Sequence, residues 1–182
     1  MPRQVPLLAR DPFGASIRRL NKEERSVMTL EQRIQRLEDI EEIRRLRNRY
    51  HYCLNEGRWA ETRDIFTDDA VVELGYLARY EGIEAIDAGF QAMGQRERFF
   101  IKQFIHGHDV DVTGDTGTGR SYLEARYGRF GVSWVVSGRY DDEYVRVNGV
   151  WKFKAMIAEL FYTVPNAVGW SGDEMHWLRP KT

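Results

Sequence analysis

A single apolar stripe constrains the first third of this chain more than any other feature. Between residues 30 and 54, apolar side chains recur at steps of three or four, the spacing of one face of an α-helix. They are Leu30, Ile34, Leu37, Ile40, Ile43, Leu46, Tyr50 and Leu54. The segment Thr29-Leu30-Glu31-Gln32 has the form of a capping box, and Gly57 is a typical stop signal. We therefore expect one helix of roughly 26 residues, long enough for its first half to pack against another subunit.

The rest of the chain reads as two shorter helices followed by long strands. Residues 59–66 and 83–94 have helical patterns, residues 71–74 a short strand pattern, and Asp68-Asp69 is expected to form a helix-capping turn. The later strand segments cover residues 99–113, 118–127, 132–147 and 151–162. Asn148-Gly149 is a strong hairpin signal between the last two. This order predicts the α+β class, with a curved antiparallel sheet around three N-terminal helices.

Size and composition favour one domain with two appendages. We assign residues 1–28 to an N-terminal extension, 29–162 to the domain, and 163–182 to a tail over a pocket mouth or a subunit contact. The formal net charge of -1 argues against a nucleic-acid partner. Without an apolar run near the ~20 residues of a membrane span, we expect no membrane contact. A single cysteine, Cys53, and a short N-terminal apolar segment favour the cytoplasm.

Several segments, taken in order, resemble the SnoaL-like branch of the nuclear-transport-factor-2-like superfamily. The resemblance covers roughly residues 30–162 and is closest in pattern to the bile-acid and scytalone dehydratases. It is carried by Tyr50, Asn55-Glu56-Gly57-Arg58-Trp59, Phe66-Thr67-Asp68-Asp69-Ala70, Gly114-Asp115-Thr116, Gly138-Arg139-Tyr140 and Asn148-Gly149-Val150-Trp151-Lys152-Phe153. It implies a cone-shaped roll around an apolar pocket, and a homodimer or homotrimer formed through the sheet.

Three polar residues are the predicted catalytic set. Tyr50 lies on the inward stripe, so its hydroxyl is expected to contact a substrate oxygen unless a backbone carbonyl satisfies it. His106 and His108 share strand parity with apolar residues, which predicts that both face the pocket, with His106 as the general base. Asn55 stands where the family usually has an Asp that orients a His, and we expect it to hold the base or the substrate, or only to end the helix.

The sequence departs from the family pattern at other polar positions. The family's His falls nearer to Gln103 than to His106, an acidic or His position falls on Ala125, and a late cationic position falls on Met156. These departures leave open whether the chain is catalytic.

Aromatic side chains on the strands and helices are the expected pocket lining, although each could equally fill the core. The predicted substrate-binding residues are Trp59, Phe66, Phe104, His108, Tyr127 and Trp134. We expect no cofactor, because the Gly-rich segment 114–119 joins two strands rather than opening a helix. Four scattered His residues predict no metal site.

Two hypotheses from different classes follow. The first is a cofactor-independent lyase of the dehydratase type, or an isomerase, acting on a hydrophobic, cyclic small molecule such as a polyketide- or steroid-like compound. The alternative is a non-catalytic domain that binds a small molecule or mediates assembly. A structural subunit of an oxygenase would also fit the fold, but no residue selects it.

Overall fold

The N-terminal half of the fold is organised by one long helix. The structure, a computed structural model, describes residues 28–96 and 100–170. Helix α2 (Leu30–Asn55) has 26 residues and the predicted capping box, in which the Gln32 backbone N–H donates to Thr29 Oγ1 (3.2 Å) and the Thr29 N–H donates to Gln32 Oε1 (2.9 Å). Gly57 follows the helix with φ of 70°, a conformation that favours glycine. The predicted extension at residues 1–28 lies outside the described residues except for Met28.

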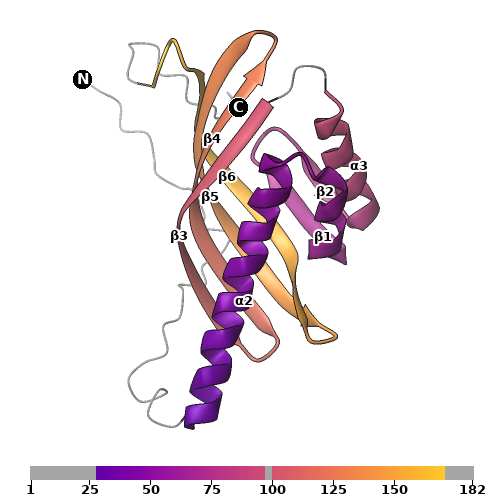
Figure 1. Ribbon diagram of the computed structural model, residues 1–182, viewed down its shortest axis with the longest axis vertical. Coiled ribbons are helices and arrows are strands. Elements are labelled where there is room, and N and C mark those ends of the chain that lie inside the picture. Colours follow the sequence, from indigo (N-terminus) through magenta and orange to yellow (C-terminus); the bar gives the residue numbers. More distant parts are fainter. Residues whose placement is uncertain (1–27, 97–99, 171–182) are drawn as a thin grey trace, which may run out of the picture.

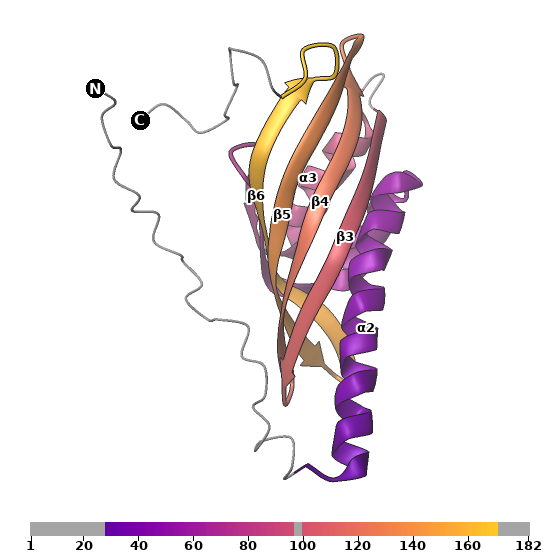
Figure 2. The same ribbon diagram turned by 90° about the vertical axis from the view of Figure 1, so that its left-hand side faces the viewer.

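A six-stranded sheet forms the second layer (Figures 1 and 2). Its strand order is β2-β1-β6-β5-β4-β3. The strands are β1 (Phe66–Leu74), β2 (Arg79–Glu81), β3 (Phe100–Thr113), β4 (Thr116–Arg129), β5 (Val132–Val147) and β6 (Val150–Pro165). The predicted α+β class and curved sheet are confirmed, but the sheet is mixed, because β1 pairs with β6 in parallel. The antiparallel expectation came from hairpin turns, and no hairpin joins β1 to β6.

The helices cover one face of this sheet. Helix α2 lies against β3, while the 3₁₀ helix η1 (Trp59–Ile65) and helix α3 (Ile83–Gly94) pack by β1. Figure 2 looks onto the opposite face, with α3 behind the strands. The core cluster lies between the two layers and includes Ile43, Phe66, Phe90, Tyr144 and Phe153. We call the helix-covered side the inner face.

A β-bulge in β3 reverses the predicted orientation of two residues. His106 pairs with Tyr122 and His108 pairs with Ser121, so Gly107, with φ of 61°, is an extra residue. Side chains before and after the bulge therefore follow different parity. His108 lies on the inner face as predicted, but Phe104 and His106 point outward with exposed fractions of 49% and, for the His106 side chain, 61%. The prediction that His106 and Phe104 face the pocket is wrong for this reason.

Asp68 and Asp69 do not form the predicted helix-capping turn. Both lie within β1, where its pairing with β6 is irregular between Phe66 and Val71. Asp69 accepts a hydrogen bond from Thr67 Oγ1 (3.0 Å) and forms an ion pair with Lys154. The Asp69 carboxylate is therefore satisfied at a strand irregularity.

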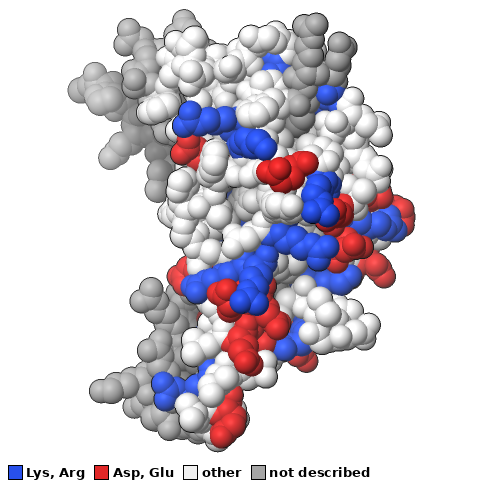
Figure 3. Space-filling view, in the orientation of Figure 1, with Lys and Arg blue, Asp and Glu red and all other residues white. Residues whose placement is uncertain are grey.

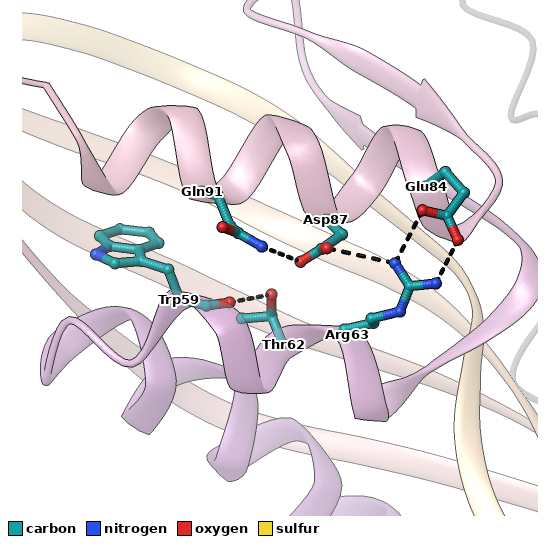
Figure 4. Close-up of polar contacts among 6 residues, drawn as sticks. All are labelled: Trp59, Thr62, Arg63, Glu84, Asp87 and Gln91. Atoms are coloured by element: carbon teal, nitrogen blue, oxygen red, sulfur yellow. Dashed lines mark hydrogen bonds and ion pairs between the residues drawn. The ribbon is translucent and has the colours of Figure 1, made fainter.

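The interface between η1 and α3 is fixed by side chains that Figure 4 shows together. Arg63 forms ion pairs with Glu84 and with Asp87, the latter at 3.3 Å, and Thr62 Oγ1 donates to the Trp59 carbonyl (2.7 Å). The Trp59 indole packs against Gly94 so closely that a methyl group there would overlap it. Trp59 therefore holds η1 against α3, and its predicted contact with a substrate stays a prediction.

The N-terminal half of α2 leaves part of its apolar stripe uncovered among the described residues. Leu30, Ile34 and Leu37 are exposed. On the face shown in Figure 3, positive and negative side chains are intermixed, and α2 itself carries the Arg45–Glu41 ion pair (3.2 Å). Packing of the exposed stripe against another subunit stays a prediction.

Candidate functional site

Helix α2 presents a row of polar groups to the sheet. Arg47, Tyr50 and His51 occupy positions i, i+3 and i+4, and so share one helix face. Arg47 and Tyr50 are fully buried, as Tyr50 was expected to be, and His51 is nearly so. The apolar stripe read from the sequence does not include His51, because that pattern counts apolar residues only. The inward face of α2 is wider than the stripe and is partly polar.

Polar side chains of the sheet face this row. Tyr140, Asp142 and Tyr144 alternate along β5 and are all buried on the inner face, while β3 contributes Gln103 and His108. Strand β4 lies between β3 and β5 and has Gly119 at this level. A Cβ at Gly119 would come within 2.6 Å of His108 Nε2 and 2.9 Å of Tyr144 Cε2. The absence of a side chain at this position therefore allows His108 and Tyr144 to meet across β4.

Arg47 and Asp142 form an ion pair in the interior. Arg47 Nε lies 3.3 Å from Asp142 Oδ2, and both side chains have no exposed surface. The guanidinium carbon lies 3.6 Å from the centroid of the Tyr140 ring, and Arg47 Nη1 donates to Met156 Sδ (3.0 Å). The cation that the family resemblance placed on the last strand, at Met156, is thus supplied next to Met156 by the helix. Removing one partner of such a pair costs about 3–5 kcal/mol, because the other charge is left buried and unpaired.

Tyr144 connects this ion pair to His108. The Tyr144 hydroxyl donates to Asp142 Oδ2 (2.8 Å), and its oxygen lies 3.2 Å from His108 Nε2. Because the only hydroxyl proton is used on Asp142, Nε2 must be the protonated nitrogen of a neutral His108. His108 Nδ1 then has the free lone pair. The arrangement is a basic nitrogen on an imidazole held in one tautomer by a tyrosine and a carboxylate.

Burial and the Arg47 charge determine the ionisation of the cluster. Burial, then Arg47 and Arg44, lower the pKa of His108 to about 3. Burial and then Arg47 lower the pKa of His51 well below its usual range. Burial raises the pKa of Asp142 to about 6, against the opposing effects of Arg47 and Tyr144. At neutral pH both imidazoles are therefore neutral, and Asp142 is ionised beside Arg47.

Several buried polar atoms of this cluster meet no hydrogen-bond partner of normal geometry. They are Arg47 Nε and Nη2, the Tyr50 hydroxyl, both ring nitrogens of His51, Ser121 Oγ and Asp142 Oδ1. Arg47 Nε still contacts Asp142 as an ion pair, and the nearby Tyr140 is one of the groups that raise the pKa of Tyr50. Buried polar groups are normally satisfied, so such a concentration indicates a place where a polar ligand or water belongs.

Asn55 binds backbone rather than an imidazole. Its Nδ2 donates to the Gln103 carbonyl (2.9 Å), and its Oδ1 accepts from the Gln103 N–H (2.7 Å). The Gln103 side chain in turn accepts from the Tyr140 hydroxyl (3.5 Å). Asn55 therefore joins the end of α2 to β3, and the family's Asp–His pair is replaced here by two amides.

The remaining predicted lining residues divide between the core and a stacked pair on the inner face. Phe66 packs in the core, with its ring centroid 5.3 Å from that of Phe153. Tyr127 and Trp134 stack on each other (5.8 Å between centroids, 3° between planes) farther along the inner face. The structure thus brings Tyr50 and His108 into the same polar interior. Tyr127 and Trp134 lie farther along the inner face, whereas His106 and Phe104 lie on the outer face.

Sequence reasoning missed Arg47 and Asp142, the two charges of the site. A charged residue one position after Leu46 and three before Tyr50 is the available signal on the helix. On β5, Asp142 shares parity with Tyr140 and Tyr144, which could have indicated a buried carboxylate.

Among the residues that the structure describes, no group of three His, Cys, Asp or Glu could hold a metal ion. In that same part of the chain, no helix is long and apolar enough to cross a membrane.

Comparisons with known proteins agree on the fold. Residues 35–157 match the family model described as the SnoaL-like domain. A proposed scytalone dehydratase from Novosphingobium aromaticivorans superposes with a TM-score of 0.65 at 22% identity, over 70% of this chain and 87% of that one. A hexachlorocyclohexane dehydrochlorinase from Novosphingobium barchaimii superposes with a TM-score of 0.65 at 19% identity, over 81% of this chain and 99% of that one. A Mycobacterium tuberculosis protein of unknown function superposes with a TM-score of 0.62 at 20% identity, over 69% of this chain and 73% of that one. At these identities the structures show the shared fold alone.

Replacing Asn55 by Asp is expected to destabilise the protein. The carboxylate would keep the contact with the Gln103 N–H but lose the donor to the Gln103 carbonyl, and two oxygens would then face each other. We expect a loss of about 1–3 kcal/mol in the free energy of unfolding, measured by urea denaturation. Asn48→Asp, the same change at an exposed position of α2, is the control. Equal stability of the two variants would contradict the bridging role of Asn55.

The stability of the protein should depend on His108 as the pH falls. The pKa of His108 is lowered to about 3 in the folded chain, against about 6.5 when unfolded. The stability due to the neutral imidazole is therefore fully present above pH 6.5 and is lost as the pH falls toward 3. Between pH 7.5 and 4.5, the unfolding free energy of the native protein should fall by about 2 kcal/mol more than that of His108→Gln. Parallel curves for the two proteins would show that His108 is not held neutral by burial.

Proposed function

The chain belongs to the SnoaL-like domain family, and we propose that it is a cofactor-independent lyase or isomerase acting on an apolar, cyclic small molecule. In this proposal His108 is the general base, and Tyr50 and Arg47 stabilise the negative charge that develops on a substrate oxygen. The observation that carries the proposal is the connected set His108, Tyr144 and Asp142 in the buried interior. The names of two structural neighbours, a dehydrochlorinase and a proposed dehydratase, support the reaction class in general terms.

The geometry supports His108 as the base that His106 was predicted to be. With Nε2–H directed at Tyr144, the lone pair of Nδ1 is available to take a proton from carbon. Tyr144 and Asp142 act as positioning residues, because they fix the tautomer and orientation of the imidazole. His106 lies on the outer face next to Glu124 (3.6 Å) and has no place in this mechanism.

Two groups on α2 support stabilisation of an oxyanion. The Tyr50 hydroxyl and Arg47 Nη2 are buried and meet no protein partner of normal hydrogen-bond geometry, so each could donate to an oxygen that gains charge. Such donors act strongly in a water-poor interior, because little solvent screens them and they need not reorganise. Removal of one donor of this kind typically lowers a rate by about 10²–10³.

The low pKa of His108 agrees with this division of roles. In the resting protein, burial and Arg47 both oppose formation of an imidazolium. When His108 takes a proton from a carbon next to a carbonyl, the carbonyl oxygen becomes negative at the same moment. That oxygen beside Arg47 offsets the cation–cation repulsion, so the base becomes stronger as the transition state forms.

The proposed step is balanced for both reaction types. The C–H electron pair forms a double bond to the carbonyl carbon as His108 Nδ1 receives the proton, and the carbonyl π pair moves onto its oxygen to give the enolate. For elimination, the carbonyl re-forms, the carbon–carbon double bond shifts to the neighbouring carbon, the bond from that carbon to its hydroxyl breaks, and the imidazolium gives its proton to the departing hydroxyl as water. For isomerisation, the carbonyl re-forms as the conjugated system takes the proton back from the imidazolium at a different carbon.

A non-catalytic binding domain is the second candidate. It is favoured by the residue types at positions 55 and 103, where the family's acid–base pair is expected: the Asn55 side chain binds the Gln103 backbone, and the Gln103 side chain binds Tyr140. This candidate predicts retention of an apolar ligand without chemical change. The oxygenase-subunit hypothesis gains no support from the contacts of the described residues.

Deuterium exchange at carbon tests the proposed function without knowledge of the natural substrate. The protein is incubated in D₂O with a panel of cyclic ketones, and incorporation next to the carbonyl is followed by mass spectrometry. We expect the native protein to accelerate exchange for at least one ketone, and His108→Gln to lower that rate by about 10²–10⁴. His106→Gln, the same change on the outer face, should leave the rate unchanged.

A matched pair of glycine variants tests the positioning of His108. Gly119→Ala places a methyl group between His108 and Tyr144, whereas Gly128→Ala on the same strand meets only an ordinary 3.7 Å contact with Phe100 Cβ. The exchange rate should fall in Gly119→Ala and stay near the native value in Gly128→Ala. Ketone binding without exchange in the native protein would favour the non-catalytic candidate, and an unchanged rate in His108→Gln would exclude His108 as the base.

A further inference from the structure

Arg47 has more hydrogen-bond donors than its surroundings can use. It is fully buried, and a guanidinium carries five N–H donors. Its Nε faces one carboxylate oxygen of Asp142 without hydrogen-bond geometry, its Nη1 faces the weak acceptor sulfur of Met156, and its Nη2 has no partner. Asp142 Oδ2 is in addition shared with the Tyr144 hydroxyl. Asp142 therefore satisfies only a small part of the buried cation.

Two groups with free donors lie beside Arg47 on the same helix face. The Arg47 guanidinium carbon lies 5.2 Å from the Tyr50 ring centroid, and the Tyr50 and His51 rings lie 5.2 Å apart. The Tyr50 hydroxyl and both nitrogens of His51 are buried and meet no partner of normal hydrogen-bond geometry, although Tyr140 and Gln103 lie near enough to affect their pKa values. A neutral imidazole offers one N–H and one acceptor nitrogen, and a hydroxyl offers one O–H and an acceptor oxygen, so two further donors lie on the helix face that Arg47 occupies. Asp142 Oδ1 is also buried without a partner, but no acceptor among the described residues meets Arg47 Nη2 with hydrogen-bond geometry.

A carboxylate matches this set of donors in both charge and geometry. It offers about four lone-pair sites on two oxygens, and it forms paired, charge-assisted hydrogen bonds with a guanidinium. Burial is the first cause of the lowered pKa of His51 and of His108, and the Arg47 charge adds to it in both cases. A neutral carbonyl would satisfy fewer donors, and a cationic ligand would meet repulsion from Arg47.

Beyond the polar cluster, the same inner face becomes apolar. Leu123 and Ala125 on β4 and Val136 on β5 are buried there, and the stacked rings of Tyr127 and Trp134 follow. Met156 lies next to Arg47 and is a long, unbranched side chain of the kind that can change rotamer to admit a ligand. A ligand with a polar head and an apolar ring would therefore meet complementary surfaces in sequence along the sheet.

We propose that the interior binds the carboxylate of its substrate through Arg47 Nη2, Tyr50 and His51, with the apolar ring of the same molecule against β4 and β5. This inference rests on the proposed function and deepens it by naming the substrate class as cyclic compounds that carry a carboxylate. Asp142 is then the internal anion that holds Arg47 in place when no substrate is bound.

A pair of isosteric probes tests the preference for an anion. Benzoate and benzamide have the same ring and nearly the same shape but differ in charge, and their binding to the full-length protein can be measured by isothermal titration calorimetry. We expect benzoate to bind at least ten-fold more tightly than benzamide at pH 7. Asp142→Asn should strengthen benzoate binding several-fold, because it removes the anion that competes for Arg47.

The double variant Arg47→Met with Asp142→Asn removes both charges and so avoids leaving one of them buried alone. Provided that circular dichroism shows a folded protein, this variant should lose the benzoate preference, so that the ratio of the two affinities approaches one. Equal affinities of the native protein for the two probes, or no binding of either, would overturn the inference.

The outcome is separable from that of the deuterium-exchange test. A benzoate preference without ketone exchange would support the anion site and contradict the proposed reaction. Ketone exchange that depends on His108, with no benzoate preference in the native protein, would support the proposed reaction and contradict the anion site.

Discussion

The structure depends on a positive charge enclosed between α2 and the sheet. Arg47 is the largest of the fully buried side chains, and an isolated ion in such a place would cost several kcal/mol. Asp142 balances its charge, the Tyr140 ring lies against the guanidinium at 3.6 Å, and Tyr144 adds a donor to the shared carboxylate. The composition of the interior follows from this one requirement. Tyrosines rather than phenylalanines line β5 at this level, since they can both pack and donate.

Burial, and after it the same charge, keeps two histidines neutral on the same side of the sheet. An imidazole that became protonated near Arg47 would add a second positive charge to a poorly solvated space. His51 and His108 therefore stay neutral, and each keeps one nitrogen that can accept a proton or a hydrogen bond. A neutral base next to a fixed cation suits a reaction that moves a proton off carbon and leaves negative charge on oxygen. The family membership and the shared fold are compatible with that chemistry, and the proposed assignment to this chain rests on the cluster itself.

The secondary structure could be predicted from the sequence because its signals are local. The stripe that ends at Leu54, the capping box at Thr29 and the Asn148-Gly149 turn each act within a few residues, and the structure confirms all three. The site could not be predicted to the same degree. One extra residue at Gly107 reversed the orientation of His106 and Phe104, and strand periodicity alone does not reveal a bulge. The pairing of Arg47 with Asp142 joins residues far apart in the chain, for which no local pattern exists.

The central claim is that Arg47 and Asp142 form one coupled unit in the interior, and a double-mutant cycle tests it most directly. The unfolding free energies of Arg47→Met, Asp142→Asn and the double variant are compared with that of the native protein by chemical denaturation. We predict that each single change costs about 3–5 kcal/mol, and that the double change costs far less than the sum of the two. Additive costs would mean that the two charges do not interact, and would contradict the claim that the interior is organised around their pairing.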